Sequence, residues 1–346
     1  SDVANLSVMG YAPDLYYTGR SPLEALSIGV KMSPEDVSYR CNLVTLSEDE
    51  NYENKTMRDY SAGEITTSEA HELISFLAEN LPLEGAELYG GVSYRHCLLF
   101  KNADTGAILT PPHDISDRKI TDYLPKGEHA DRFLTLMKKS FDMLKDHPVN
   151  IERRKKGLNP ANSIWLWGEG RKPALDDFYK LHGLHGAVIS AVDLIKGIGI
   201  AANMEVIEVA GATGTIKTNF DGKAEATVNA LKKNDFVYIH LEAPDECGHQ
   251  GNYEEKKQSI ELIDRKIVGP VLEFLKAQNV PFKIAVLPDH ATPIVKKTHV
   301  SDPVPYLIYD SENPVGSGIK VFDEENAAKT GIYTASGVDF MKKLLS

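Results

Sequence analysis

Five acidic and imidazole side chains in the second half of the chain have the types and spacing needed to bind metal ions. They are Asp245, His249, Asp289, His290 and His299. Carboxylate oxygen and imidazole nitrogen suit Mn²⁺ or Zn²⁺ far better than an iron–sulfur cluster or Cu(I). Five such ligands are too many for one structural zinc and too few for two closed sites. The set therefore predicts a two-metal centre with open positions and at least one further protein ligand, an arrangement that serves phosphoryl transfer.

These candidates follow predicted strands at the points where the strands end. Residues 236–241 (FVYIHL) and 282–287 (FKIAVL) are short β-branched and aromatic runs that indicate strands. One acid–imidazole pair follows the first run, four residues apart, and an adjacent pair follows the second. Because ligands gather beyond the carboxyl ends of strands in an open α/β sheet, we expect these side chains to converge. The alternative is that they are unrelated loop residues, such as a helix cap or a surface histidine.

The rest of the second half alternates in the same way. Apolar residues at helical spacing cover 252–278, an amphipathic helix is expected over 337–345, and a third strand is expected over 304–309. Strands that alternate with helices predict a parallel α/β sheet.

The first half has a different pattern, which indicates a separate α+β unit. Strands are expected over 39–47 and 93–100, and helices over 67–80 and 131–145. A basic stretch at 153–156 precedes a Gly/Pro/Asn-rich segment at 157–163, which is typical of a linker.

Composition restricts the partners of the chain. Its 346 residues include 38 Lys and Arg against 50 Asp and Glu, a net charge of −12, which argues against binding to nucleic acid or to an anionic membrane. We expect no signal peptide or membrane span, and the 3 cysteines are too few and too scattered for a disulfide scaffold. The sequence predicts a cytoplasmic protein that acts on a small molecule. Positive charge for an anionic substrate would have to be local.

Motifs along the whole chain resemble those of a known enzyme family. The stretches APDECGH, PDHATP and KTHVSDPVPY resemble the metal-binding motifs of the alkaline phosphatase superfamily. Together with SDVANLSVMGY, YYTGRSPLEA, YRCNLVTL, PPHDISD and IWLWGEG, they resemble the archaeal type of cofactor-independent (2,3-bisphosphoglycerate-independent) phosphoglycerate mutase. The resemblance implies an alkaline-phosphatase-like core, in which helices flank a mainly parallel sheet. We expect this core in residues 1–35 and 174–346, and an inserted α+β substrate-binding or cap domain in residues 36–173.

The resemblance also assigns roles to residues. It implies that one Mn²⁺-like ion is held by Asp245, His249 and His299, and a second by Asp289, His290 and Ser1. Ser1 would be the nucleophile, which becomes phosphoserine as 3-phosphoglycerate and 2-phosphoglycerate are interconverted in glycolysis and gluconeogenesis. Mn²⁺ is the expected metal, with Zn²⁺, Co²⁺ and Mg²⁺ as alternatives. The family places a strand with a GDG-like motif before this serine, and its Asp would be a further ligand, whereas this sequence starts at the serine itself.

Cationic side chains are expected to bind the anionic substrate. Arg95, His113 and Arg171 lie within family-like motifs, and Arg20 and Arg40 are further candidates. Arginine binds phosphate or carboxylate through two parallel hydrogen bonds, which makes it suited to phosphoglycerate. Two alternatives remain open at this stage: another metal-dependent phosphomonoesterase or phosphomutase of the superfamily, and an inactive fragment that lacks the N-terminal strand.

Overall fold

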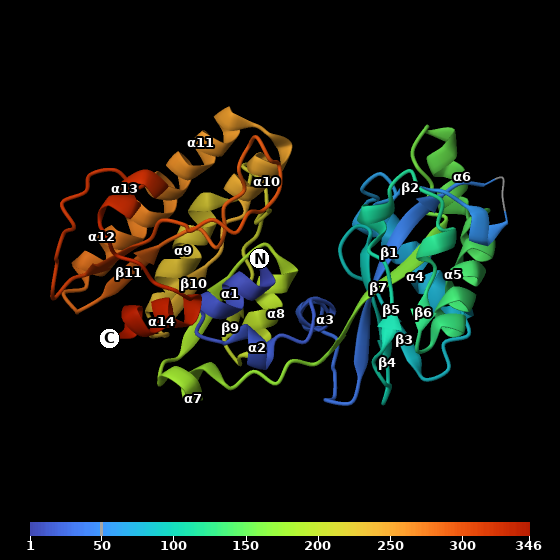
Figure 1. Ribbon diagram of the computed structural model, residues 1–346, viewed down its shortest axis with the longest axis horizontal. Coiled ribbons are helices and arrows are strands. Elements are labelled where there is room, and N and C mark those ends of the chain that lie inside the picture. The colour runs from blue at the N-terminus through green and yellow to red at the C-terminus, as the bar shows by residue number, and fades with distance from the viewer. Residues whose placement is uncertain (49–50) are drawn as a thin grey trace. The chain divides into compact units, whose positions relative to one another are not determined.

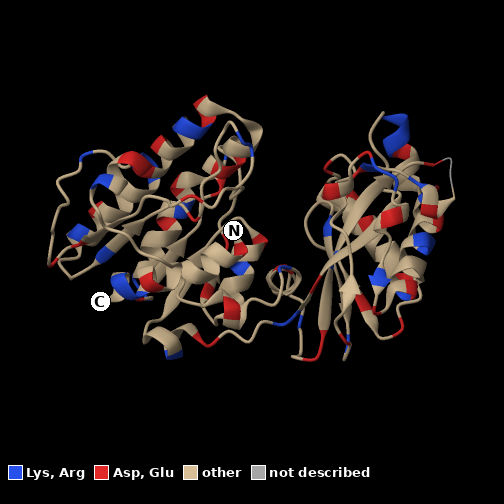
Figure 2. Ribbon diagram, in the orientation of Figure 1, with Lys and Arg blue, Asp and Glu red and all other residues tan. Residues whose placement is uncertain are grey.

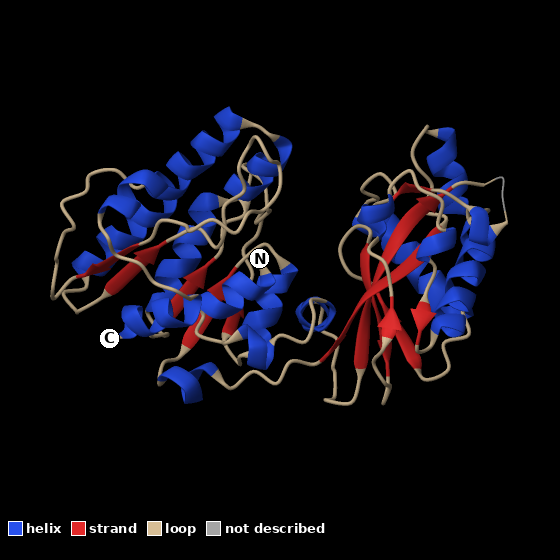
Figure 3. Ribbon diagram, viewed as in Figure 1, coloured by secondary structure: helices blue, strands red, loops and turns tan. Residues whose placement is uncertain are grey.

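The computed structural model describes residues 1–48 and 51–346. The chain divides into two compact units (Figure 1): unit 1 contains residues 1–17 and 175–346, and unit 2 contains residues 18–174. Each unit combines helices with β-sheet (Figure 3), which confirms the α/β class in its broad sense. The first boundary differs from the one expected near residue 35, because the helix after residue 20 packs in unit 2.

Unit 2 is built on a five-stranded sheet around β1 (Val37–Leu46). β4 (Arg95–Phe100) and β7 (Ser163–Arg171) both pair antiparallel with β1. β3 (Ala86–Tyr89) pairs antiparallel with β4, and β2 (Met57–Asp59) pairs antiparallel with the end of β1. The strands expected over 39–47 and 93–100 are therefore neighbours in one sheet.

Helices cover both faces of this sheet because its side chains alternate in direction. Leu98 and Phe100 join a large core that also contains buried residues of α4 (Thr67–Asn80) and α5 (Ala130–Leu144). Cys97 and Leu99 instead share a smaller cluster with Ala25 of α3 (Ser21–Ser27). This second cluster places α3 in unit 2.

The remaining elements of unit 2 are short, except for α6. They are η1 (Tyr52–Asn54), β5 (Ala107–Ile108), η2 (Pro112–Ile115), η3 (Thr121–Tyr123), β6 (Lys126–Gly127) and α6 (Pro148–Lys155). The last turn of α6 carries the basic stretch (Figure 2). Its Arg153 is buried and donates to Glu69 and to the carbonyls of Ala62 and Asn159. The segment 157–163 connects α6 to β7 inside unit 2, so it does not link the two units.

Unit 1 contains a three-stranded parallel sheet. Its order is β10 (Phe236–Ile239), β8 (Gly186–Ile189) and β9 (Glu205–Ile207). The crossovers between them contain α8 (Asp193–Ala201) and α9 (Phe220–Leu231), as parallel pairing requires. The parallel sheet expected for the second half is confirmed for these strands.

The last two strands of unit 1 pair differently from the expectation. β11 (Lys283–Val286) and β12 (Leu307–Asp310) form an antiparallel two-stranded sheet, in which Lys283 lies opposite Asp310. The prediction that both strands extend the parallel sheet is therefore wrong among the described residues. The physical reason is that a long loop, rather than a crossover helix, joins these strands, so the chain can turn back on itself.

Helices complete unit 1. They are α1 (Asp2–Val8), α2 (Pro13–Tyr16), α7 (Phe178–His182), α10 (Ala243–Gln250), α11 (Tyr253–Ile263), α12 (Gly269–Ala277), α13 (Glu324–Lys329) and α14 (Gly337–Leu345). A π-helical segment, Asp264–Val268, joins α11 to α12. Acidic and basic residues alternate along α11 (Figure 2), as expected for an exposed helix face. No helix in residues 1–48 and 51–346 is long and apolar enough to cross a membrane.

Candidate metal centre

Asp245 lies among three imidazoles in unit 1. Its Oδ2 is 3.3 Å from Nε2 of His249, and its Oδ1 is 3.3 Å from Nε2 of His299. The same Oδ1 is 3.9 Å from Nδ1 of His290. Residues separated by as many as 54 positions in the sequence therefore meet at one carboxylate, as the strand-end argument predicts.

The local structure of α10 explains how Asp245 and His249 reach the same point. Pro244 lies in the first turn of this helix, where its missing N–H costs nothing. Residues four apart lie on one helix face, so the carboxylate and the imidazole point in the same direction. Gly251 then ends the helix in the left-handed conformation, with φ of +71°.

The loop after β11 brings His290 and His299 together. The N–H of Val300 donates to the carbonyl of Ala291 over 3.0 Å, and this bridge folds the loop back on itself. The two imidazole ring centres are consequently 3.8 Å apart. His249 is fixed against the same loop, because its Nδ1 hydrogen-bonds the carbonyl of Lys297 at 3.0 Å.

Ser1 lies on the other side of His290. It is the N-cap residue of α1, but its side chain makes no capping hydrogen bond. Its Oγ instead lies 3.0 Å from Nε2 of His290, and Oδ2 of Asp289 lies 3.4 Å from the same nitrogen. The hydroxyl is therefore directed at the cluster, as a nucleophile or ligand would need to be.

The six side chains form one continuous cluster. Ligand atoms of Asp245, His290 and His299 all lie within 4.8 Å of one another, a set that crosses the two groups implied by the family resemblance. The contact between Asp245 and His290 joins those groups.

The donor chemistry of the cluster fits a divalent cation of the Mn²⁺ or Zn²⁺ type. Carboxylate oxygens, imidazole nitrogens and a hydroxyl point at one another, and the Nε2 atoms of His249 and His299 are only 3.0 Å apart. Burial lowers the pKa of both His290 and His299, so these imidazoles are neutral near pH 7 and keep a lone pair for a metal.

Two residues that were not predicted from the sequence, Thr292 and Lys256, fix the position of Asp245 through hydrogen bonds. The buried Thr292 hydroxyl donates to Oδ1 of Asp245 and lies 3.3 Å from Nδ1 of His290. Lys256 of α11 donates to the carbonyl of Thr292 over 2.8 Å. Thr292 lies in the PDHATP motif, and its closeness in sequence to Asp289 and His290 could have marked it as a supporting residue.

Asn5 and Tyr238 were also missed, and they connect Ser1 to Asp289. The Asn5 amide donates to Oδ2 of Asp289 and to the carbonyl of Ser1, each over 2.7 Å. The Tyr238 hydroxyl donates to Oδ1 of Asn5 over 2.6 Å. Burial, reinforced by the charge of Asp289, raises the pKa of Tyr238, so this hydroxyl remains a donor.

Two further titratable groups, the half-buried His240 and the buried Lys223, lie near the carboxyl end of β10. His240 directly follows this strand, and burial lowers its pKa to about 4, against the opposing effect of Asp289. Burial also lowers the pKa of Lys223 in α9 to about 8, and Glu242 opposes this shift. His240 interacts electrostatically with Asp289, Asp245 and His290, although it is not among the predicted ligands.

The predicted substrate contacts Arg95, His113 and Arg171 all lie in unit 2, and each has a different environment. Arg171 donates to the carbonyls of Glu35 and Ala103, so its guanidinium braces loops of the unit. Arg95 is exposed at the start of β4. His113 is 48% exposed and contacts Trp167 edge-on, with ring centres 5.2 Å apart.

Arg40 lies in the electrostatic neighbourhood of Arg20, Arg95 and His113. Its guanidinium lies 4.0 Å above the Trp167 ring and pairs with Glu24 at 2.7 Å. Burial lowers the pKa of Arg40, and the positive charges of Arg20 and Arg95 contribute to this shift. Burial likewise lowers the pKa of His113, with Arg40 and Arg20 adding to the effect. Glu24 also pairs with Arg20 at 2.6 Å, so one carboxylate offsets the charges of both Arg20 and Arg40.

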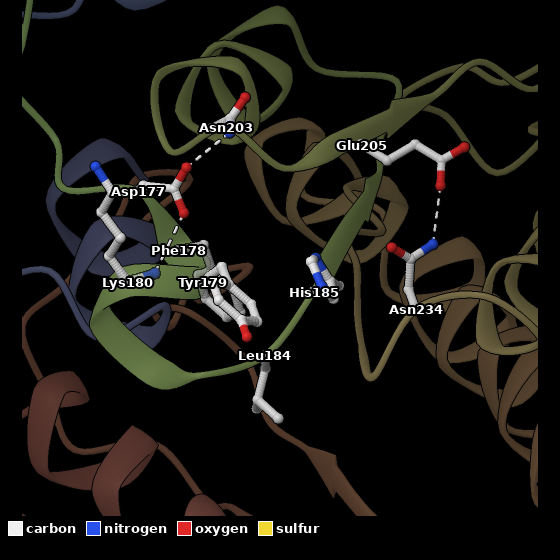
Figure 4. A pocket seen from close by; sticks show the side chains of 10 residues that line it. Asp177, Phe178, Tyr179, Lys180, Leu184, His185, Asn203, Glu205 and Asn234 are labelled. Carbon is white, nitrogen blue, oxygen red and sulfur yellow. Dashed lines mark hydrogen bonds between the residues drawn. The ribbon is translucent and has the colours of Figure 1, made fainter.

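A cavity of about 370 Å³ lies elsewhere in unit 1, near the amino ends of β8 and β9 (Figure 4). Two of its acids already have partners: Asp177 accepts from Asn203, and Glu205 accepts from Asn234. Its polar groups do not converge as the metal-centre residues do.

Comparisons with known proteins show which family this chain resembles. A family model described as 2,3-bisphosphoglycerate-independent phosphoglycerate mutase matches residues 1–150. A protein of that name from Methanosarcina barkeri is 48% identical over 342 residues, which cover 99% of this chain and 84% of the relative. A Geobacter sulfurreducens protein named as a probable enzyme of the same kind is 46% identical, with coverage of 100% and 86%.

Solved structures are similar over nearly the whole chain. A protein from Pyrococcus horikoshii has a TM-score of 0.75 at 28% identity, covering 99% of this chain and 82% of that one. A cofactor-independent phosphoglycerate mutase from Thermoplasma acidophilum has a TM-score of 0.61 at 26% identity, with coverage of 98% and 84%. From these similarities, this chain belongs to the family of 2,3-bisphosphoglycerate-independent phosphoglycerate mutases.

Proposed function

We propose that this protein interconverts 3-phosphoglycerate and 2-phosphoglycerate by phosphoryl transfer through a phosphoserine at Ser1, on a core of the alkaline phosphatase type. The observation that carries the proposal is the position of the Ser1 hydroxyl, which lies 3.0 Å from His290 at the edge of a carboxylate and imidazole cluster. The relatives named for this reaction, 48% and 46% identical over nearly the whole chain, support it independently.

The candidate ligands would hold two divalent ions. Asp245, His249 and His299 would hold one ion, and Asp289, His290 and Ser1 the other. When bound, such ions supply charge neutralisation for the phosphoryl group and lower the pKa of a coordinated hydroxyl. Mn²⁺ matches the mixed oxygen and nitrogen donors, and Zn²⁺, Co²⁺ and Mg²⁺ are the alternatives to test.

The transfer itself requires two displacements at phosphorus. Ser1 Oγ forms a bond to the phosphorus of the substrate while the bond from phosphorus to the substrate oxygen breaks. The other glycerate hydroxyl then attacks the phosphoserine and restores the Ser1 hydroxyl. Water must be excluded between these steps, since a water molecule in place of the second hydroxyl would release phosphate.

Basic side chains remain the candidates for binding the anionic substrate. Arg20, Arg40, Arg95 and His113 combine cationic guanidinium groups with an imidazole, and guanidinium recognises carboxylate and phosphate through paired hydrogen bonds. Arg171 stays among the predicted contacts, but Arg95 is the first to test, because Arg171 donates to two main-chain carbonyls and Glu24 pairs with both Arg20 and Arg40.

The test is to follow the phosphorus of 3-phosphoglycerate by nuclear magnetic resonance with the purified chain and Mn²⁺, without added bisphosphoglycerate. We expect 2-phosphoglycerate to accumulate to equilibrium with little free phosphate, and Ser1→Ala to abolish the conversion. Release of phosphate in step with substrate loss would instead identify a phosphomonoesterase. No reaction by a chain that binds Mn²⁺ would contradict the proposed function.

A further inference from the structure

Asn5 is fully buried one helical turn beyond Ser1, and it connects the nucleophile to a candidate metal ligand. We propose that Asn5 is a positioning residue, which orients the Asp289 carboxylate and the first turn of α1 for the reaction, and that Tyr238 acts through it. The inference rests on the proposed function, because it assigns a role within the same site.

The hydrogen bonds of Asn5 fix the orientation of its amide. The Ser1 carbonyl and the Asp289 carboxylate can only accept, so they must face the two N–H groups of Nδ2. The Tyr238 hydroxyl donates to Oδ1. Both N–H groups and the oxygen of the amide side chain thus have a hydrogen-bond partner, as expected for a buried amide.

The contacts of Asp289 show what this orientation achieves. Oδ2 accepts from Asn5 over 2.7 Å, and Oδ1 accepts from the N–H of His290 over 3.0 Å. Two donors, one on each oxygen and from different parts of the chain, set the plane of the carboxylate. Hydrogen bonds from neighbouring side chains orient metal ligands in this way and strengthen metal binding.

Tyr238 makes the arrangement stiffer because it belongs to β10. Its position is set by parallel pairing, in which it lies opposite Val188 of β8. The bond to Asn5 therefore ties α1 to the sheet at the level of the metal centre. A purely structural bridge would stabilise unit 1 and leave metal binding unchanged, so the two roles predict different results.

The experiment compares Asn5→Ala, Tyr238→Phe and the double variant with the unaltered chain. Tyr11→Phe is the matched control, because Tyr11 is another tyrosine of unit 1 whose hydroxyl donates one hydrogen bond, to the carbonyl of Asp176 over 2.8 Å. Mn²⁺ affinity is measured by calorimetry on metal-free protein, and kcat and KM by phosphoglycerate interconversion. Chemical unfolding reports the stability of each variant.

We expect Asn5→Ala to weaken Mn²⁺ binding and lower kcat by about 10–100-fold each, with KM nearly unchanged. Tyr238→Phe should give a smaller loss, and the double variant should match Asn5→Ala alone, because Tyr238 acts through Asn5. Tyr11→Phe should cost similar stability to Tyr238→Phe without altering Mn²⁺ affinity.

Mn²⁺ affinity of Asn5→Ala equal to that of the unaltered chain would overturn the proposal, as would an additional effect of Tyr238→Phe in the Asn5→Ala background. If Asn5→Ala does not fold, the Mn²⁺ affinities of Tyr238→Phe and Tyr11→Phe are compared instead. Equal affinities in these two variants would overturn the proposal. An unaltered chain that binds Mn²⁺ but makes no product would contradict the proposed function alone, since the metal titrations would still test Asn5.

Discussion

At the scale of single residues, Asp245 is the centre of the candidate metal site. Its two oxygens lie within 3.9 Å of three imidazoles. The charge of this carboxylate also offsets the mutual repulsion that bound cations would impose on the site. Asp245 and His290 both have contacts in the two implied groups of ligands, but of these two only Asp245 carries a negative charge. Its removal should therefore affect the whole centre.

We predict that Asp245→Asn removes at least one bound ion per chain and abolishes interconversion, because the amide has lost the negative charge that balances the cation. Elemental analysis after dialysis against Mn²⁺ measures the bound metal. Asp310→Asn is the control, since Asp310 lies at the end of β12 and pairs with Lys283. Equal metal content in the two variants would contradict the assignment of Asp245.

The arginines of unit 2 give a second prediction at this scale. Arg95→Ala should raise KM for 3-phosphoglycerate about 10-fold, equivalent to about 1.4 kcal/mol, with a smaller change in kcat. Arg171→Ala should instead lower the stability of unit 2, because two carbonyls lose their donor. Steady-state kinetics and urea unfolding separate the two effects. A larger rise in KM for Arg171→Ala than for Arg95→Ala would contradict this division.

The candidate metal ligands could be predicted from the sequence because their types are restrictive and the ends of strands are recognisable. The supporting residues could not. Thr292 and Asn5 are of common types, and their roles depend on partners that lie 47 and 284 positions away. The sequence also does not reveal that the guanidinium of Arg171, a predicted substrate contact, donates to two main-chain carbonyls.

At the scale of elements, local patterns predicted position well and pairing poorly. Helices expected over 67–80 and 337–345 are present with those bounds. The helix expected over 252–278 is interrupted by a π-helical segment before Gly269 and Pro270. Proline has no N–H to donate, and its ring clashes with the carbonyl four residues earlier in a regular helix. The antiparallel pairing of β11 with β12 depends on the path of a long loop, which periodicity does not encode.

The last turn of α6 supports a stability prediction. Arg153 is 3% exposed and donates to Glu69 and two carbonyls, so Arg153→Ala should destabilise unit 2 by about 3 kcal/mol. Arg154→Ala, in the same turn but partly exposed, should cost about 1 kcal/mol or less. Tryptophan fluorescence during urea unfolding measures both, since Trp165 and Trp167 both lie on β7. Equal costs would contradict a special role for the buried guanidinium.

His96 on β4 gives a prediction about pH. Burial lowers its pKa from 6.5 to about 3, while its Nδ1 accepts from the N–H of Gly91. The unfolded chain takes up a proton below about pH 6.5 and the folded chain does not, so stability falls as pH falls. From pH 7 to pH 5 this residue alone should cost about 2 kcal/mol.

His96→Asn keeps an acceptor for Gly91 but cannot titrate, so its stability should depend less on pH over this range. Unfolding of unit 2 at pH 7 and pH 5, followed by tryptophan fluorescence, provides the comparison. The same loss of stability in both proteins would show that His96 is not the group responsible.

At the scale of the whole molecule, the chain is divided so that one unit is continuous and the other is not. Unit 2 is a single segment, 18–174, with its own large buried core, whereas unit 1 is assembled from 1–17 and 175–346. The local cations of unit 2 also stand out against a net charge of −12 for the chain. The two units should therefore differ in how independently they fold.

We predict that residues 18–174 expressed alone fold cooperatively, with the tryptophan emission of the full chain. Residues 175–346 alone should be less stable than unit 1 in the full chain, since they lack α1 and the Asn5 bonds to Tyr238 and Asp289. Urea unfolding of each fragment measures this. A non-cooperative transition for 18–174 would contradict its independence.

The contact between α1 and α14 has a consequence for biosynthesis. Gly337, the first residue of α14, approaches Ser7 and Val8 so closely that an added Cβ would lie 2.6 Å from the Ser7 side chain. Helix α1, which follows Ser1, thus packs against α14, which is translated hundreds of codons later. A nascent chain can complete unit 2 while still on the ribosome, but α1, which begins next to the proposed nucleophile Ser1, can pack against α14 only after α14 has emerged.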